Sequence, residues 1–293
     1  MAANPRPCNL CGEERQISFL YTRNGYSIHK CKRCALVYVG VLPTAAELAE
    51  LYGDSFFEAS SKFDASANSP SLVNARDRVA QILRLPGIGR TRWLDVGCAT
   101  GEFLLAGSEV AGELHGTDIS AYATSEGRRR GLQNLRDGNF ADLEYSPDYF
   151  DLITMWDLIE HVEDPARVLH KAFAYLRPGG YLVLSTGDVD SLASKVMGRF
   201  WHLMIPPMHT YFFSRSTITR YLQEAGFADL HISYTGKIVP LDFIVEKAAR
   251  LVSPRLSQAV QPVLRKLGLG RVRFLINLFD IMTVVARKPA HAN

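Results

Sequence analysis

The sequence lacks an apolar run near the ~20 residues that a membrane-spanning helix requires. It also lacks compositional bias: 47% of its 293 residues are hydrophobic and 22% are charged, which excludes a disordered or fibrous protein. The first seven residues contain no hydrophobic stretch of the kind that directs secretion. We therefore expect a cytoplasmic globular protein with room for one large domain and a small appendage.

Acidic residues are missing from 247–279, although this stretch holds seven Arg or Lys residues. Residues 1–34 are also basic, with six Arg or Lys against two Glu. Since the whole chain carries only +3, the middle of the sequence must be acidic. This distribution disfavours a nucleic acid lying across the centre and leaves the two basic segments able to meet an anionic partner.

Cysteine is scarce after residue 34, where only Cys98 remains, so a disulfide framework is not expected. The other four form two Cys-x-x-Cys pairs separated by nineteen residues, a spacing typical of zinc knuckles: Cys8, Cys11, Cys31 and Cys34. Residues 17–29 alternate as a short hairpin would. The pattern predicts a zinc ribbon over residues 1–42 whose closed thiolate site is structural, the alternative being four unrelated buried thiols.

A helical connector that can close over the main site is expected over residues 43–89, with a helix at 71–85. From residue 90 onward, short apolar strands alternate with helices, which predicts an α/β fold. The expected strands are 92–96, 114–118, 134–137, 150–155, 181–185, 229–235 and 280–286, and the expected helices are 102–111, 120–131, 165–176 and 215–225. Insertions interrupt this 90–293 domain at about 187–213 and 236–279.

One turn among these elements has the composition of a ligand-binding loop. Residues 93–103 read as an apolar strand, a glycine-containing turn and a helix start, which lets backbone approach a ligand closely. The second strand ends at Asp118, where a carboxylate can accept hydrogen bonds from both hydroxyls of a ribose. The two features together predict a nucleoside site at the first two strand tips.

This loop, Asp95-Val-Gly97-Cys98-Ala99-Thr-Gly101, resembles the first motif of class I S-adenosylmethionine-dependent methyltransferases. Further stretches resemble later motifs of the family in the same order, namely 138–143, 150–162, 176–185 and 222–227. The cysteine pairs followed by Pro43-Thr-x-x-Glu-Leu also look like a recurrent bacterial subgroup. One departure is Ala99, where the family usually has its middle glycine. The resemblance implies a Rossmann-like, seven-stranded, mostly parallel sheet with helices on both faces.

The family's cofactor contacts carry over to matching positions of this chain. The resemblance implies that Asp95 underlies the loop and that Asp118 holds the ribose, while Ile119 presses on the adenine. The remaining expected contacts with S-adenosylmethionine are Gly97, Cys98, Ala99, Gly101, Asn139, Phe140 and Trp156. For several of these, including Asp95, Cys98 and Phe140, a purely structural role is an open alternative.

Candidate catalytic residues follow the fourth strand of this pattern. If a helix begins there, Asp157, Glu160 and His161 share one face, and His209 approaches from a later segment. The set resembles the magnesium or manganese site of methyltransferases that act on small-RNA ends or quinone precursors. Three interpretations stay open: metal-assisted deprotonation, direct base catalysis by His161 or His209, and positioning alone.

The two insertions suggest what the protein contacts. Residues 186–213 are rich in aromatic and thioether side chains that suit an apolar or ring-shaped acceptor, and the candidate substrate contacts are Phe200, Trp201, His202 and Tyr211. Ordinary packing on the sheet is the alternative for these. Residues 240–252 and 256–267 have helical periodicity and resemble an amphipathic helix pair. The basic stretch 240–275 therefore fits a peripheral membrane contact, a homodimer interface or a solvated face.

Three functions follow from the sequence. The first is methyl transfer to a small molecule, sugar or lipid-linked acceptor, most often at oxygen. The second is rRNA or tRNA methylation with the zinc ribbon contacting RNA, although the Asn/Asp-Pro-Pro-aromatic motif of base N-methylation is replaced by Met155-Trp-Asp-Leu. The third is a non-catalytic zinc-ribbon interaction protein on a degenerate methyltransferase core.

Overall fold

The computed structural model describes residues 5–44, 47, 69–241, 245 and 272–290. Its centre is a seven-stranded sheet in the order β10-β13-β8-β7-β4-β5-β6. All seven predicted strands are present, as β4 (Arg92–Val96), β5 (Glu113–Asp118), β6 (Asn134–Asp137), β7 (Phe150–Trp156), β8 (Leu176–Gly187), β10 (Ala228–Tyr234) and β13 (Ile281–Arg287). Only β13 runs against its neighbours β8 and β10, so the predicted α/β, mostly parallel sheet is confirmed.

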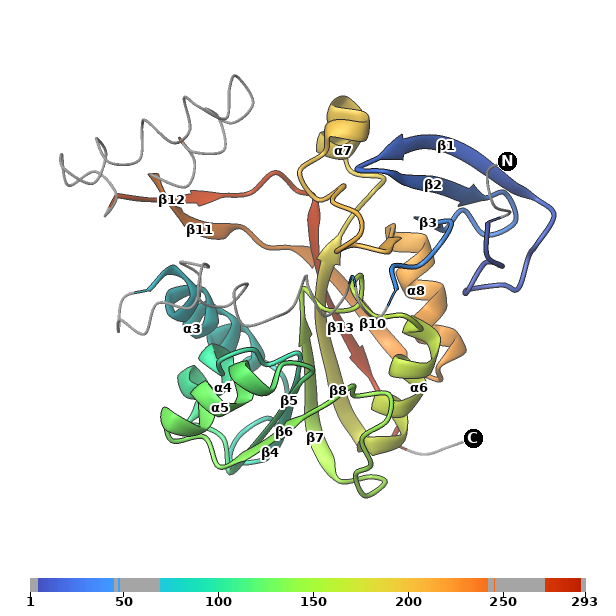
Figure 1. The fold of residues 1–293 in the computed structure, drawn as a ribbon. Coiled ribbons are helices and arrows are strands. Elements are labelled where there is room, and N and C mark those ends of the chain that lie inside the picture. The colour runs from blue at the N-terminus through green and yellow to red at the C-terminus, as the bar shows by residue number, and fades with distance from the viewer. Residues whose placement is uncertain (1–4, 45–46, 48–68, 242–244, 246–271, 291–293) are drawn as a thin grey trace.

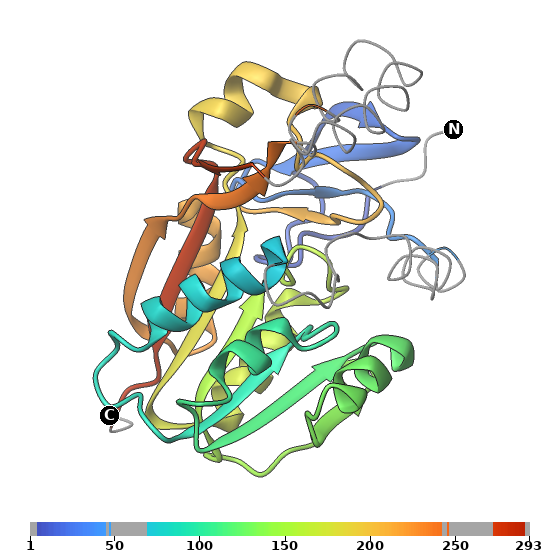
Figure 2. The same ribbon diagram turned by 90° about the vertical axis from the view of Figure 1, so that its left-hand side faces the viewer.

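Helices cover both faces of this sheet, because neighbouring residues of each strand point in opposite directions. Trp93, Leu152 and Val183 pack on one side with α3 (Pro70–Ile82) and α4 (Glu102–Gly107). Their neighbours Leu94, Ile153 and Leu184 pack on the other with α6 (Pro165–Tyr175) and α8 (Arg215–Glu224). Figures 1 and 2 show α3, α4 and α5 (Ala121–Arg129) on the first face and α6 and α8 on the second.

The N-terminal segment forms its own small sheet, in the order β1-β2-β3-β9. β1 (Ile17–Arg23) and β2 (Tyr26–Cys31) are the predicted hairpin, and β3 (Val37–Val39) follows. The fourth strand, β9 (Tyr211–Phe212), comes from the 187–213 insertion and pairs with β3. The insertion therefore ties the N-terminal segment to the methyltransferase-like core, as the upper right of Figure 1 shows.

The insertions differ in part from the sequence expectation. The first contains α7 (Leu192–Met197) and the 3-10 helix η2 (Gly198–Phe200). The second begins and ends as an antiparallel strand pair, β11 (Lys237–Pro240) and β12 (Arg273–Ile276). The expected helix from residue 240 is thus wrong for Pro240, which belongs to β11, whereas Leu241 and Val245 are helical as expected. Residues 242–244 and 246–271 of the predicted helices lie outside the described residues. Within the described ranges, no helix has the length and hydropathy to cross a bilayer.

Candidate functional site

The glycine-containing loop follows β4 and is hydrogen-bonded to the end of β5. The amides of Gly97 and Cys98 donate to the carbonyl of Thr117, at 2.7 and 3.0 Å. Gly97 and Gly101 have φ of 73° and 88°, and a Cβ on Gly101 would lie 2.2 Å from Leu132. Glycine is therefore favoured there by its positive φ, and any larger residue would also displace the Leu132 side chain; α4 begins immediately after it.

Ala99, the departure from the family motif, also lies in the left-handed region with φ of 47°. Glycine adopts this conformation freely, whereas an L-residue pays roughly 1–2 kcal/mol for it. The amide of Ala99 donates to Oδ2 of Asp118 at 2.9 Å, which helps to hold the conformation. The loop therefore keeps the geometry of a glycine while bearing a methyl group.

Asp118 ends β5 with its carboxylate directed to the loop. Its two oxygens accept from the amides of Ala99 and Ser120, both at 2.9 Å. Burial raises its pKa, and the backbone hydrogen bonds oppose that rise. Ile119 beside it is 61% exposed, so its side chain is accessible to an adenine ring and no core residue has to move for that contact.

The next strand tip supplies Asn139 and Phe140. The side chain of Asn139 accepts from the amide of Ala141 at 3.0 Å, forming a local turn. Phe140 is buried edge-to-face against Tyr175, with ring centroids 6.0 Å apart, so its side chain belongs to the core. Its backbone is the part left for a ligand.

Two ionisable groups lie beneath the loop. Asp95 is 3% exposed and accepts from the Thr154 hydroxyl at 2.6 Å. Burial raises the pKa of Asp95 to about 7, although the Thr154 hydrogen bond opposes the rise. Cys98 is buried, and burial also raises the pKa of its thiol. This thiol packs in the core beside Gly116 and does not have the exposure of a reactive nucleophile.

Asp157 is not on a helix with Glu160 and His161, so that expectation is wrong. Residues 157–163 form turns, and Asp157 has φ of 53°, which a right-handed helix does not allow. Helix α6 begins later, where Asp164 caps it and Pro165 is its first residue. The helical spacing in the sequence therefore does not correspond to one helical face.

Asp157 instead pairs with two cations that the sequence analysis did not identify. Its Oδ2 lies 3.0 Å from Nη2 of Arg78 and 2.7 Å from Nζ of Lys237, and its Oδ1 accepts from Ser185 at 2.8 Å. Burial alone would raise the pKa of Asp157, but Lys237 and Arg78 outweigh it and hold the pKa below its ordinary value. Arg78 also lies 4.4 Å above the ring of Trp156.

Glu160, His161 and His209 do come together: one ligand atom from each lies within 4.8 Å of the others. The imidazole rings meet edge to face with centroids 4.5 Å apart. Nδ1 of His161 lies 2.8 Å from the carbonyl of Met208, and Nδ1 of His209 lies 2.8 Å from that of Leu203. A neutral ring that donates through Nδ1 carries its lone pair on Nε2, the atom that accepts a proton or binds a metal.

Glu160 completes this group from a buried position. Its Oε2 has no hydrogen-bond partner among the described residues, although the side chain is enclosed. Burial raises the pKa of Glu160 to about 8, and the neighbouring charge of Asp157 adds to the rise. A buried carboxyl with one oxygen unpartnered, beside two imidazoles, fits a divalent cation as well as a shared proton.

The four residues expected to contact substrate have different surroundings. Trp201 is buried and donates through Nε1 to Asp280 at 2.8 Å. Tyr211 is buried, accepts from Arg6 at 2.6 Å and donates to the carbonyl of Glu163 at 2.9 Å. His202 and Phe200 are more open, with Phe200 56% exposed. Trp201 and Tyr211 are thus enclosed by other parts of the protein, and Phe200 and His202 are the more accessible of the four.

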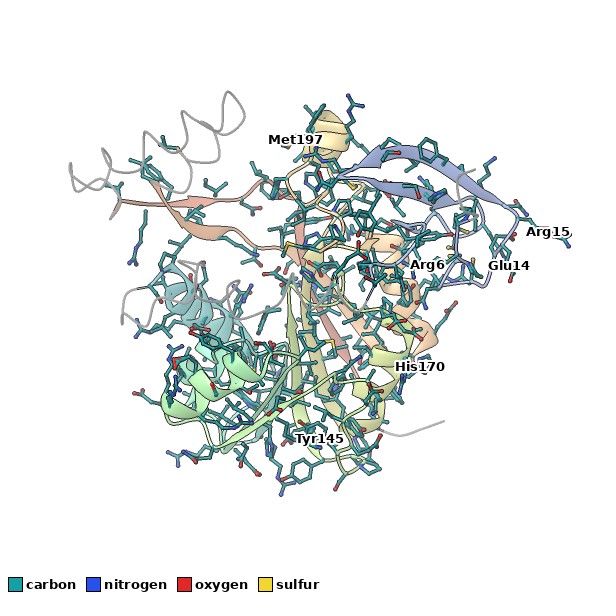
Figure 3. All side chains as sticks on the ribbon, viewed as in Figure 1. Arg6, Glu14, Arg15, Tyr145, His170 and Met197 are labelled. Atoms are coloured by element: carbon teal, nitrogen blue, oxygen red, sulfur yellow. The ribbon has the colours of Figure 1, made fainter. Side chains whose placement is uncertain are left out.

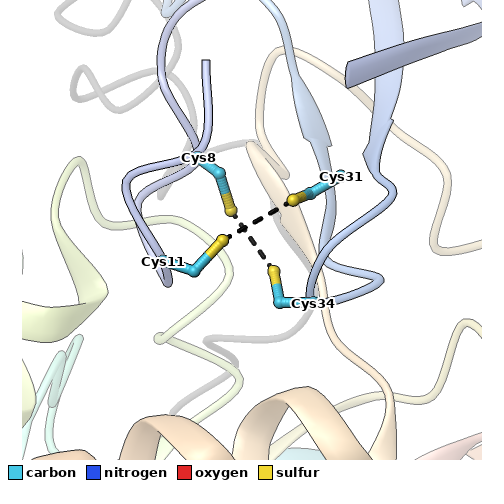
Figure 4. Close-up of side chains that lie close together, drawn as sticks. All are labelled: Cys8, Cys11, Cys31 and Cys34. Carbon is cyan, nitrogen blue, oxygen red and sulfur yellow. Dashed lines mark hydrogen bonds between the residues drawn. The ribbon is translucent and has the colours of Figure 1, made fainter. Parts of the chain in front are cut away.

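The cysteine pairs meet as the spacing predicts (Figure 4). Sγ of Cys8 lies 3.4 Å from that of Cys34, and Sγ of Cys11 lies 3.6 Å from that of Cys31. A tetrahedral zinc with bonds of about 2.3 Å places its sulfurs about 3.8 Å apart, so the four thiols fit that ion. No ligand position would remain for a substrate in such a site.

The zinc-ribbon-like segment packs directly against helices α6 and α8. Asn9 donates to Asp164, the α6 cap, at 3.0 Å and accepts from Tyr221 of α8 at 2.8 Å. Arg6 lies over the rings of Tyr38 and Tyr211, 5.3 and 4.5 Å from their centroids. Figure 3 shows Arg6 on the inner side of the N-terminal segment, toward the rest of the protein, whereas Glu14 and Arg15 lie at its outer edge.

Comparison with known proteins assigns most of the chain to a methyltransferase family. A family model described as a methyltransferase domain matches residues 48–232. A ubiquinone biosynthesis O-methyltransferase of Alkalilimnicola ehrlichii is 30% identical over 161 residues, which cover 51% of this chain and 64% of that protein. One from a Shewanella species is 26% identical over 133 residues, covering 43% and 56%. The chain thus spans less than two thirds of the length of either relative.

Solved structures show the same fold at low identity. The [4+2]-cyclase SpnF is similar with a TM-score of 0.58 and 19% identity, covering 86% of this chain and 98% of that one. Because the fold includes an enzyme named for cyclisation, the reaction has to be argued from the residues of the site.

Proposed function

Since the chain belongs to the methyltransferase domain family and has the class I fold, we propose that it transfers a methyl group from S-adenosylmethionine to an oxygen of a small-molecule, sugar or lipid-linked acceptor. The observation that carries this proposal is the adjacency of two features. Asp118 and the loop at 97–101 lie at the ends of β5 and β4, and Glu160 and His161 follow β7, the strand next to β4, at the same edge of the sheet.

The loop and strand tips hold the donor in this account. Asp118 accepts hydrogen bonds from the ribose, Asn139 and the Phe140 backbone meet the adenine, and Gly97 and Ala99 line the methionine part. Leu158 limits the space beside Gly97, where a Cβ would lie 2.8 Å from its Cδ1. The loop that bears His161 therefore lies against the loop that holds the donor, which is what in-line transfer requires.

His161 and His209 prepare the acceptor. A hydroxyl oxygen must lose its proton as it attacks the methyl carbon, and an imidazole whose Nε2 carries the lone pair can accept that proton. Both rings are oriented by a backbone carbonyl at Nδ1, and the tautomer that donates there carries its lone pair on Nε2. The names of the relatives, which are O-methyltransferases, support oxygen as the attacking atom and a small molecule over RNA as the acceptor.

Glu160, His161 and His209 are also the residues that would hold Mg²⁺ or Mn²⁺. A bound cation would lower the pKa of the acceptor hydroxyl. Asp157 is not part of that ligand set, because it pairs with Arg78 and Lys237. The four thiols of the N-terminal segment would hold a structural Zn²⁺.

Methyl-labelled donor tests the proposal. The protein is incubated with the donor and, separately, a bacterial small-molecule extract or total bacterial RNA, with and without added Mg²⁺ and with EDTA. We expect label in the small-molecule fraction. Label in RNA instead would favour the RNA function, and failure to bind S-adenosylhomocysteine would favour a non-catalytic role. Loss of transfer in EDTA, restored by Mg²⁺, would assign the cation.

A further inference from the structure

The second insertion, which lies outside the matched family region, brings a cation to the edge of the site. Its strand β11 pairs with β12, and Lys237 lies opposite Ile276. Asn74 of α3 fixes the strand, because its side chain donates to the carbonyl of Ile238 at 3.0 Å and accepts from the amide at 2.9 Å. Lys237, the adjacent residue, is thereby held over the end of β7.

Arg78 and Lys237 contact the same carboxylate oxygen, Oδ2 of Asp157. Two cations therefore face one anion, and the group carries one unit of positive charge in excess. Its side chains are partly screened from water, with 23%, 37% and 35% exposed for Arg78, Lys237 and Asp157. An excess charge in such surroundings favours an anionic ligand more strongly than it would in open solvent.

The bound donor does not remove this excess positive charge. In S-adenosylmethionine the ammonium and carboxylate cancel, so its sulfonium adds one positive unit. The net charge of the site is the same whether the carboxylate of the donor contacts Arg78 or Lys237. The sulfonium and the Asp118 carboxylate of the donor site then offset each other, which leaves the one positive unit of Arg78, Lys237 and Asp157. Burial raises the pKa of Glu160 to about 8, so this carboxyl is mostly protonated near neutral pH. An acceptor that brings negative charge would therefore bind better than a neutral one of the same shape.

Resting on the proposed function, we propose that the acceptor carries an anionic group, a carboxylate or a phosphate, and that Lys237 binds it. Arg78 is the less exposed cation and is engaged by the Trp156 ring. Lys237 has three donors, and Asp157 is its contact among the described residues. Lys237 is then a specificity-determining residue that the insertion adds to the family's core.

Weak-binding probes test this on the full chain saturated with S-adenosylhomocysteine. Benzoate and inorganic phosphate are the anionic probes, and benzamide is the neutral counterpart of benzoate. We expect at least one anion to bind about tenfold more tightly than benzamide, as a charge-assisted contact would give. Tighter binding of benzoate would indicate that the acceptor carries a carboxylate, and tighter binding of phosphate would indicate a phosphate.

Three variants locate the binding. Lys237→Met should weaken binding of the preferred anion about tenfold, and Lys237→Arg should retain most of it. Lys195→Met, on α7, removes the same charge elsewhere and should change nothing. The inference fails if neither anion binds, or if Lys237→Met binds them as the wild type does. Titration of S-adenosylhomocysteine into each variant keeps the two proposals apart, since its binding tests the donor site alone.

Discussion

The rings of His161 and His209 meet edge to face, with centroids 4.5 Å apart. Each ring is held through Nδ1 by a backbone carbonyl at 2.8 Å. They come from different loops, one after β7 and the other before β9, and the pairing of Thr210 with the carbonyl of Glu160 at 2.9 Å joins those loops. The candidate chemistry of the protein therefore depends on how the first insertion is anchored.

Replacing either histidine should separate chemistry from donor binding. His161→Ala and His209→Ala should each lower kcat about 10²–10⁴-fold, the usual contribution of a general acid or base. The affinity for S-adenosylhomocysteine should stay within about twofold, since neither ring belongs to the donor loop. Steady-state kinetics and calorimetry measure the two quantities, and normal turnover in both variants would refute base catalysis.

Ala99→Gly should stabilise the protein by about 1 kcal/mol, because glycine relieves the left-handed strain. The matched control is Ala80→Gly, at an exposed position inside helix α3, which should destabilise by about 1 kcal/mol. Chemical denaturation of both variants gives the comparison. Equal losses of stability would show that residue 99 does not have the positive φ described here.

Asp95 should make stability depend on pH. Its pKa is about 7 in the folded protein, above the ordinary 3.8, so the folded state holds the proton more tightly. The contribution of Asp95 to the free energy of unfolding is fully present below pH 4. It is lost as the pH rises through 7, and the loss is roughly 4 kcal/mol at most.

Asp95→Asn should remove that loss while still accepting from Thr154. The free energy of unfolding of this variant should gain on the wild type between pH 4 and 8. Asp142→Asn, at an exposed carboxyl, should follow the wild type. Parallel curves for Asp95→Asn and the wild type would contradict an elevated pKa.

Zinc content provides a fourth prediction. The purified chain should contain one zinc per molecule, and Cys34→Ser should lose it and unfold at a lower temperature, because the thiolates join the hairpin to the α6–α8 side. Cys98→Ser should keep the zinc, since that thiol lies apart from the four. Elemental analysis decides the matter, and a wild type without metal after purification with zinc would contradict the assignment.

Local patterns predicted much of this structure. Apolar runs such as those of β4 and β7 identify buried parallel strands, and the paired Cys-x-x-Cys spacing identifies the cysteine cluster. The positions of Gly101 and Asp118 indicated a ligand loop because their chemistry is set within a few residues. The family resemblance then gave the order of the motifs.

Long-range contacts could not be predicted in the same way. Arg78 and Lys237 lie 79 and 80 residues from Asp157, and no local pattern reveals such a meeting. The pairing of β3 with β9 depends likewise on tertiary packing. The spacing of Asp157, Glu160 and His161 was misleading, because i, i+3 and i+4 share a face only when the segment is helical.

The donor site is the central claim, and calorimetric titration of S-adenosylhomocysteine tests it most directly. The wild type should bind it, and Asp118→Asn should bind about 10- to 100-fold more weakly, since a charged acceptor for the ribose hydroxyls is lost. Asp137→Asn, at the exposed tip of the next strand, should bind as the wild type does. Absence of binding by the wild type, or unchanged binding by a folded Asp118→Asn, would contradict the account.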